Sequence, residues 1–252
     1  MTAGQRVQQQ PAFLLHHRPF RDSSLLLDVL SRDHGRIALV ARGARGAKSR
    51  VRGVLRPFLP LRLSWLLRSD LGTLTGAELE RQPLALGGDS LLSGYYLNEL
   101  LMNFLHRHDP QPEVYCAYSG AVHALAGTRE PAPVLRAFEL ELLGLLGYGI
   151  HFEAGRSGEH ALDPSAHYEY RVEQGAVRVQ RSEGEMVFSG EELAGIRDQR
   201  FDEPAMLRAA GRLLRAVIAF HLGGRELKSR KVLLDLHRSR ARMDERSQAG
   251  KT

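Results

Sequence analysis

The chain has 252 residues, 43% of them hydrophobic and 25% charged, a composition that excludes a disordered protein and suits one large domain or two to three small ones. Its single cysteine, Cys116, excludes an intrachain disulfide and a zinc site built from cysteines. No apolar run approaches the roughly 20 residues of a membrane span, so we expect a cytoplasmic protein without a membrane partner. The net charge of +6 is uneven, because residues 1–82 carry fourteen Lys or Arg against six Asp or Glu, whereas residues 83–252 carry twenty-one against twenty-three.

Residues 11–82 are predicted to form five short β-strands. Apolar or alternating runs that favour strands lie at 12–17, 24–30, 36–40, 58–67 and 71–80. The tripeptide Asp33-His34-Gly35 is a turn signal between the second and third of these runs. Five short strands in about 70 residues fit a small closed barrel of the oligonucleotide-binding (OB) type, although an SH3-like barrel would give almost the same pattern.

Residues 34–69 contain nine Lys or Arg and no Asp or Glu. A surface of one charge repels itself unless an anion neutralises it, and the commonest extended anion in a cell is nucleic acid. The alternative is a solvated face whose arginines pair with acids elsewhere in the chain. The residues predicted to contact nucleic acid are Arg36, Arg42, Arg45, Lys48, Arg50, Arg52 and Arg56. Aromatic residues are sparse in this stretch, so base stacking is less supported than contact with phosphates.

Beyond residue 82 the apolar period changes from two to about 3.6, which indicates helices. Helices are predicted over Leu91–Leu105, Glu113–Ala126, Pro131–Leu146, Gly190–Gln199, Pro204–Leu222 and Ser229–Arg240. Helical periodicity is lost between 150 and 190, where Gln174-Gly175 is the predicted turn of a hairpin. We therefore predict a multidomain α+β protein. Its parts are an OB-type barrel at 1–82, a mainly α-helical domain at 83–149 and 190–245, and a small β-insert at 150–189.

Patterns typical of catalytic and metal sites are absent. The chain has no phosphate-binding glycine loop, nucleophile elbow or zinc-binding His/Glu helix. His16 and His17 are neighbours on a predicted strand, so they point to opposite sides and cannot share a metal. Glu99 lies in the most apolar helix, where such a carboxylate is more often satisfied by a buried Arg or a Tyr hydroxyl than catalytic. We expect no enzyme activity, no metal and no cofactor.

Two basic features lie in the helical region. Arg136 has the apolar neighbours Leu135 and Phe138, and it is either an ordinary surface arginine or a cation at the mouth of an apolar groove. Such a groove would suit an acidic peptide that also offers an aromatic anchor. The stretch 225–242 holds seven Lys or Arg and two acids, which fits a solvated helix end or a second nucleic-acid patch equally well.

Six short motifs follow one another in an order typical of one protein family. They are His17-Arg-Pro-Phe20, Ser23–Val29, Gly35-Arg36 with Ala41–Arg45, Ser93–Leu101, Arg136–Glu139 with Leu146–Gly149, and Leu222–Arg230. Each motif is weak alone, but the ordered set is specific and covers roughly residues 12–232. The chain thereby resembles the bacterial recombination mediators of the RecO family.

This resemblance implies an N-terminal OB barrel followed by a helical domain with a small inserted β-element. It also implies binding of single- and double-stranded DNA, annealing of complementary strands, and work with RecR to help load RecA onto strands coated with single-strand-binding protein. Such a protein acts in the cytoplasm and is associated with the nucleoid when it is bound to DNA. Family members hold the acidic C-terminal tail of single-strand-binding protein, and the matched arginine is Arg136. The residues predicted to form the groove for this tail are Tyr96, Leu100, Leu135 and Phe138.

The chain departs from the family in its insert. Many members carry four cysteines there as a zinc site, whereas residues 150–190 contain none, so metal dependence is not carried over. The insert would instead be held by an apolar cluster of Phe152, Tyr168, Tyr170, Val187 and Phe188. Two other functions remain open. One is an RNA- or ribosome-associated OB protein with a helical docking domain; the other is a nucleic-acid enzyme, which the lack of an acidic cluster disfavours.

Overall fold

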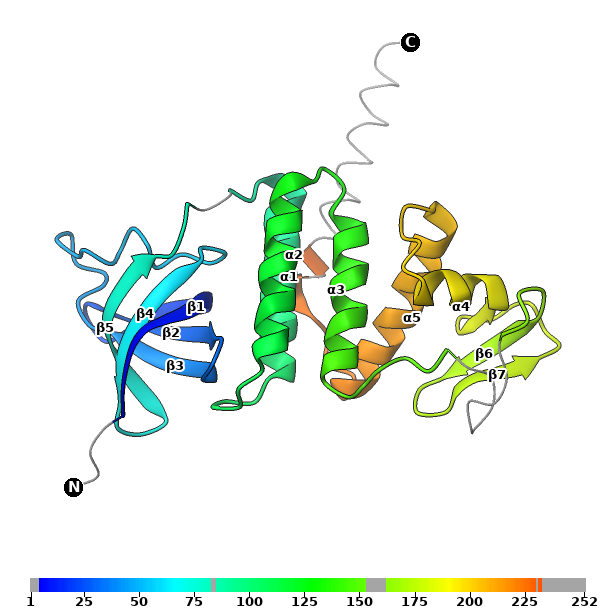
Figure 1. Cartoon of the computed structure of the whole chain (residues 1–252), viewed down its shortest axis with the longest axis horizontal. Coiled ribbons are helices and arrows are strands. Elements are labelled where there is room, and N and C mark those ends of the chain that lie inside the picture. Colours follow the sequence, from blue (N-terminus) through cyan, green and yellow to red (C-terminus); the bar gives the residue numbers. More distant parts are fainter. Residues whose placement is uncertain (1–4, 83–84, 153–161, 230, 233–252) are drawn as a thin grey trace, which may run out of the picture. The chain divides into compact units, whose positions relative to one another are not determined.

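The structure of the protein is a computed structural model that describes residues 5–82, 85–152, 162–229 and 231–232 (Figure 1). Two compact units are present, the first drawn from Met1–Arg129 together with Leu227–Thr252 and the second from Glu130–Glu226. The predicted fold class is confirmed, since an N-terminal barrel precedes helices and a small sheet. No helix among the described residues is long and apolar enough to cross a membrane.

The first unit contains a closed barrel of five strands. They are β1 (Gln5–Phe20), β2 (Ser24–Ser31), β3 (Gly35–Ala41), β4 (Leu61–Leu67) and β5 (Leu71–Leu79). The neighbour order is β1-β2-β3-β5-β4, and the barrel closes where β4 pairs with β1. The pairing of β3 with β5 is parallel and the other pairings are antiparallel, which is OB topology.

Strand β1 extends further toward the N-terminus than the sequence predicted. Its first half pairs with β4 and its second half pairs with β2. The pairing register is irregular between Val7 and Gln10 and again between Leu14 and His16. Such irregularities bend a strand, which allows β1 to pair with both β4 and β2. The glutamine-rich start of the chain is therefore part of the barrel.

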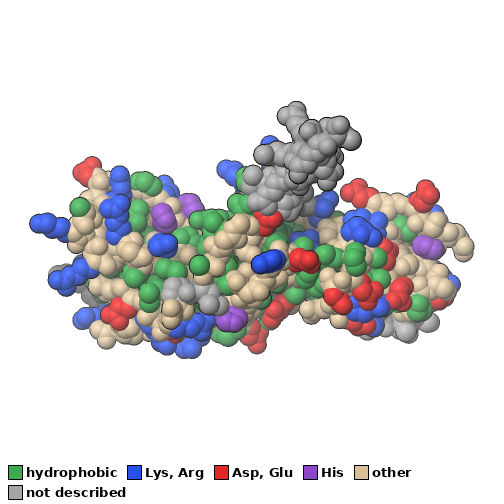
Figure 2. All heavy atoms as spheres, turned by 90° about the horizontal axis from the view of Figure 1, so that it is seen from above, with side chains coloured by type: hydrophobic (Ala, Val, Ile, Leu, Met, Phe, Trp, Pro, Cys, Tyr) green, Lys and Arg blue, Asp and Glu red, His purple; other side chains and the backbone are tan. Residues whose placement is uncertain are grey.

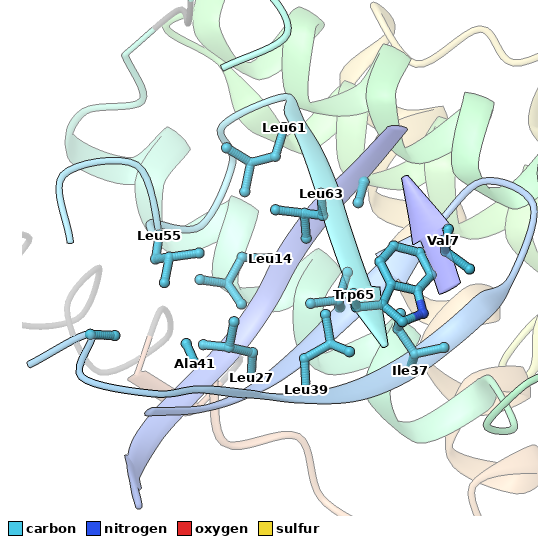
Figure 3. Close-up of a cluster of buried hydrophobic side chains, with 13 residues drawn as sticks. Val7, Leu14, Leu27, Ile37, Leu39, Ala41, Leu55, Leu61, Leu63 and Trp65 are labelled. Carbon is cyan, nitrogen blue, oxygen red and sulfur yellow. The ribbon is translucent and has the colours of Figure 1, made fainter. Parts of the chain in front are cut away.

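The barrel is filled by its own side chains, while Lys and Arg side chains lie on its outside (blue, at the left of Figure 2). Figure 3 shows the inward-pointing residues, among them Leu14, Leu27, Leu39, Leu63 and Trp65, all of which are buried. A five-stranded barrel leaves little room beyond what its side chains occupy. Ligands must therefore bind at its loops or its outer surface.

Helices α1 (Gly88–Phe104) and α2 (Pro112–Gly127) complete most of the first unit. The buried Tyr118 hydroxyl donates to Asn98 Oδ1 at 2.6 Å, and Asn98 Nδ2 donates to the carbonyl of Leu15 at 2.7 Å. Leu15 lies at the irregular point of β1, where its carbonyl has no ladder partner in β2. This buried hydrogen-bonded chain fixes both helices to the barrel, because each of its polar groups would otherwise lack a partner in an apolar setting.

Glu99 connects α1 to the C-terminal part of the chain. Its carboxylate accepts the backbone N–H groups of Lys228 at 2.9 Å and Ser229 at 2.8 Å, and it also accepts the Ser229 hydroxyl. These partners differ from the buried Arg or Tyr hydroxyl expected from the sequence. A carboxylate that accepts N–H groups where a helical segment begins is favoured by the helix dipole. The helix predicted over Ser229–Arg240 lies mostly outside the described residues.

The second unit is built from helices and a small sheet. Its elements are α3 (Pro131–Leu145), β6 (His167–Arg171), β7 (Gly175–Val179), β8 (Val187–Ser189), α4 (Gly190–Arg197) and α5 (Pro204–His221). The sheet has the order β7-β6-β8 with antiparallel pairing, as the hairpin signal at Gln174-Gly175 predicts. Tyr168, Tyr170, Val187 and Phe188 of the predicted apolar cluster are buried. Ser189 and Glu192 form a capping box at the start of α4.

Candidate nucleic-acid interface

Six of the seven predicted DNA-contacting residues lie on one loop, residues 42–60 between β3 and β4, which we call the basic loop. They are Arg42, Arg45, Lys48, Arg50, Arg52 and Arg56. The predicted strand runs end at residue 40 and resume at residue 58, and in the structure β3 ends at Ala41 and β4 begins at Leu61. Three glycines and two prolines keep the residues between them out of the sheet, because both residue types weaken a strand interior.

The basic loop is anchored by apolar residues that alternate with its cations. Ala44, Leu55 and Phe58 are buried, and the first two belong to the barrel's hydrophobic cluster. Turn hydrogen bonds support the loop, including Gly46 N–H to the Gly43 carbonyl at 3.0 Å. A loop held in this way presents its charges without a large ordering cost when a ligand binds.

Five cations of the basic loop are exposed and form no ion pair with any of the described residues. They are Arg42, Lys48, Arg50, Arg52 and Arg56. Exposed arginines of the second unit behave differently: Arg171 pairs with Glu169 and Arg197 pairs with Asp198. The basic loop therefore lacks the neutralising carboxylates that a merely solvated face would have, and its positive potential is available to a polyanion.

Arg45 has a structural task within this surface. Its Nη1 donates to the carbonyls of Arg21 at 3.4 Å and Asp22 at 3.2 Å, and its backbone N–H donates to the Ser23 carbonyl at 2.9 Å. The basic loop is thereby tied to the turn between β1 and β2. Arg21 of that turn is exposed and lies with its guanidinium over the Phe20 ring. Sequence reasoning missed this cation because Arg21 lies outside the acid-free stretch.

The structure does not bring Arg36 together with the basic loop. This half-buried arginine lies near the start of β3, whereas the loop follows the strand's last residue. Its guanidinium donates to Asp28 at 3.1 Å and to the carbonyls of Met102 and Leu105 at the end of α1. Arg36 thus holds α1 against the barrel. Sequence alone cannot separate it from its neighbours, because its partners are distant in the chain.

A cavity of about 480 Å³ opens beside the turns that join β2 to β3 and β4 to β5. Arg68, the last cation of the acid-free stretch, lines this cavity together with Asp33 and Asp70. The guanidinium of Arg32 and the amide of Gln10 donate to the Asp33 carboxylate, and they lower its pKa to about 2. The cavity therefore carries charges of both signs, which does not favour a polyanion there.

The residues predicted to bind a protein tail lie in both units. Arg136 is on α3, where its side chain is 17% exposed and its Nη2 donates to the buried Glu139 carboxylate at 2.6 Å. Leu135 and Phe138 are buried on the same helix. Tyr96 and Leu100 are buried on α1, in the first unit. A groove formed by these residues stays a prediction.

Side chains that bind metals do not gather in the described parts of the chain. No group of three or more His, Cys, Asp or Glu side chains is arranged there to hold a metal ion. Burial, and then the neighbouring His16, lowers the pKa of His17, and both disfavour the charged form of this imidazole. Cys116 is exposed and unpaired with any other cysteine.

Comparisons with known proteins agree with the architecture. Residues 6–83 match the family model described as Recombination protein O N terminal, and residues 87–231 match Recombination protein O C terminal. The chain is 42% identical over 237 residues to the DNA repair protein RecO of Aromatoleum aromaticum, covering 94% of this chain and 99% of that one. It is 43% identical to the same-named protein of an Azoarcus species, with the same two coverages. The RecO protein of Aliivibrio salmonicida is 40% identical over 91% of this chain and 97% of its own.

Proposed function

The chain belongs to the recombination protein O family, and we propose that it is a DNA repair and recombination mediator that binds DNA through the basic loop of its barrel. One observation carries the assignment of the site: five exposed cations lie on an anchored loop and have no carboxylate partner among the described residues. Release of the counterions condensed on DNA drives binding to such a surface. Phosphate contacts carry no sequence information, so binding is sequence-independent.

Annealing follows from the same charge. Two single strands repel each other through their phosphates, and a bound layer of arginines lowers that repulsion so that the strands can approach. Base pairing then supplies the specificity. No covalent bond is made or broken in this process, so the protein acts as a mediator without catalysing a reaction.

The protein partners of this mediator are the C-terminal tail of single-strand-binding protein and RecR, with which it helps to load RecA. The proposed receptor of the tail is Arg136 on α3, where its neighbours Leu135 and Phe138 are apolar. Arg136 donates from Nη2 to the Glu139 carboxylate. A guanidinium has five N–H donors, so others remain for a ligand carboxylate. A charge-assisted contact of this kind is worth about 1.5–3 kcal/mol.

Annealing of complementary strands, bare and coated with the cognate single-strand-binding protein, tests this function. The basic-loop variant Arg42→Ala/Lys48→Ala/Arg50→Ala/Arg52→Ala should fail with both substrates. Arg45 is left in place because it anchors the loop. A parent protein that does not accelerate annealing of either substrate would contradict the proposed function.

A variant that tests the tail site must take account of the ion pair between Arg136 and Glu139. Removing Arg136 alone leaves a buried carboxylate without this cation, which is costly. Arg136→Ala is therefore combined with Glu139→Gln, and its melting temperature is compared with that of Glu139→Gln alone. The double variant should anneal bare strands like the parent and lose roughly 10- to 150-fold in affinity for a tail peptide, as loss of about 1.5–3 kcal/mol implies. Unchanged peptide affinity would place the tail elsewhere.

A further inference from the structure

Tyr95 is an exposed aromatic residue on an otherwise well-buried part of α1. The residue is 44% exposed, whereas its chain neighbours Gly94 and Tyr96 are buried. Large aromatic side chains contribute most to stability when they are buried. A tyrosine that leaves nearly half of its surface in water contributes less to the core and offers a flat apolar face to a ligand.

Phe58, from the end of the basic loop, holds Tyr95 in place. The two ring centroids are 5.1 Å apart and the ring planes meet at 75°, an edge-to-face contact. This contact uses at most one face of the Tyr95 ring, and 44% of the residue's surface stays exposed. Phe58 itself is only 6% exposed and packs against α1.

The contact between Phe58 and α1 depends on two unusual local features. Phe58 has φ of +69°, a left-handed conformation that is strained for a residue with a side chain. Gly94 provides the space for its ring, because a Cβ at that position would lie 2.8 Å from Phe58 Cε1. Strain that the surrounding structure maintains is characteristic of functional sites. Here it fixes the end of the basic loop against the helix that carries Tyr95.

Through Phe58, Tyr95 is joined to the end of the basic loop that carries Arg56. Arg56 precedes Phe58 by two residues, so their Cα atoms are at most about 7 Å apart. Arg56 is exposed and forms no ion pair with the described residues. Surfaces that bind single strands combine cations that follow the backbone with aromatic rings on which bases stack. The sequence does not reveal this pairing of a cation with an aromatic ring, because Tyr95 lies on another element, 37 positions after Phe58.

We propose that Tyr95 is a stacking platform for an unpaired base of single-stranded DNA whose phosphates lie on the basic loop. The inference rests on the proposed function and deepens it. Bases of a duplex are already stacked and paired, so they cannot use the platform without an unstacking cost. Tyr95 thus favours single strands over duplex, which lets the protein release the annealed product more readily than it releases its substrates.

The test is the affinity of Tyr95→Ala for a fluorescent single-stranded oligonucleotide and for the matching duplex, at one fixed salt concentration. Stacking on an aromatic side chain is worth about 1–3 kcal/mol per base, so single-strand affinity should fall roughly 5- to 150-fold. Duplex affinity should stay within about two-fold, and Tyr95→Trp should keep single-strand affinity, because indole also stacks on bases. The matched control is Tyr148→Ala, which removes a tyrosine that is 42% exposed in the second unit, and it should bind both DNA forms like the parent.

Any other outcome contradicts the stacking role of Tyr95. The affinity of the basic-loop variant then shows whether the proposed function is contradicted as well. If Tyr95→Ala binds single strands as tightly as the parent while the basic-loop variant does not, the platform is wrong and the proposed function stands. If neither change weakens binding, the proposed function fails as well. An equal loss for single strands and duplex in Tyr95→Ala would show that Tyr95 supports the shape of the loop and does not stack on bases. Unchanged melting temperatures confirm that the variants fold.

Discussion

The salt dependence of DNA binding should follow the five basic-loop cations that have no ion pair within the described part of the chain. For single strands the slope of log affinity against log salt is about −0.7 for each phosphate neutralised. If all five cations contact phosphates, the slope is about −3.5, and affinity should fall roughly 100-fold between about 50 and 200 mM salt. The basic-loop variant retains one of the five, so its slope should be near −0.7, a loss of about three-fold over the same range.

The assay is fluorescence anisotropy of a labelled oligonucleotide at several salt concentrations. A matched control removes four arginines of the second unit, each of which pairs with a carboxylate; they are Arg171, Arg178, Arg181 and Arg197. This control loses as much positive charge as the basic-loop variant, yet it should keep the parent slope. A parent-like slope in the basic-loop variant would refute the reasoning and make residues 225–242 the next candidate. Equal flattening in both variants would show that net charge alone sets the affinity.

Three further predictions concern the architecture around this surface. Tyr118→Phe leaves Asn98 Oδ1 without this donor and should lower the free energy of unfolding by about 1–3 kcal/mol in urea titrations, whereas no change would mean that the buried chain does not hold the helices. Glu99→Gln should speed amide hydrogen exchange at Ser229, since a charged acceptor is lost there, and parent-like protection would show that other contacts anchor this segment. Because Cys116 is the only thiol, elemental analysis should find no stoichiometric zinc and chelator should leave the melting temperature unchanged; one zinc per chain would contradict this.

The barrel could be predicted from the sequence because its signals are local. Period-two alternation and the turn at Asp33-His34-Gly35 specify strands regardless of what they pair with. The start of β1 was missed for the opposite reason. Gln5–Gln10 is mostly polar, and it becomes a strand only because β4, more than 50 residues later, supplies its hydrogen-bond partners.

The candidate site was likewise predicted where its signal is local. A run of basic residues can be recognised in the sequence itself, so the cations of the basic loop were identified as a group. The structural tasks of Arg36 and Arg45 depend on Asp28, the end of α1 and the turn after β1, and a charge count cannot separate these two residues from the rest. Tyr95 is linked to the basic loop by its ring contact with Phe58, 37 positions away, and the partners of Glu99 come about 130 residues later.

The most direct test of the central claim is to map where single-stranded DNA lies on the protein. An oligonucleotide with photoreactive thymines can be cross-linked to the full chain, and the modified peptides can be identified by mass spectrometry. The account predicts cross-links within residues 42–60 and at Tyr95, and their loss at high salt. Cross-links confined to the second unit, Glu130–Glu226, with none in the basic loop, would contradict it.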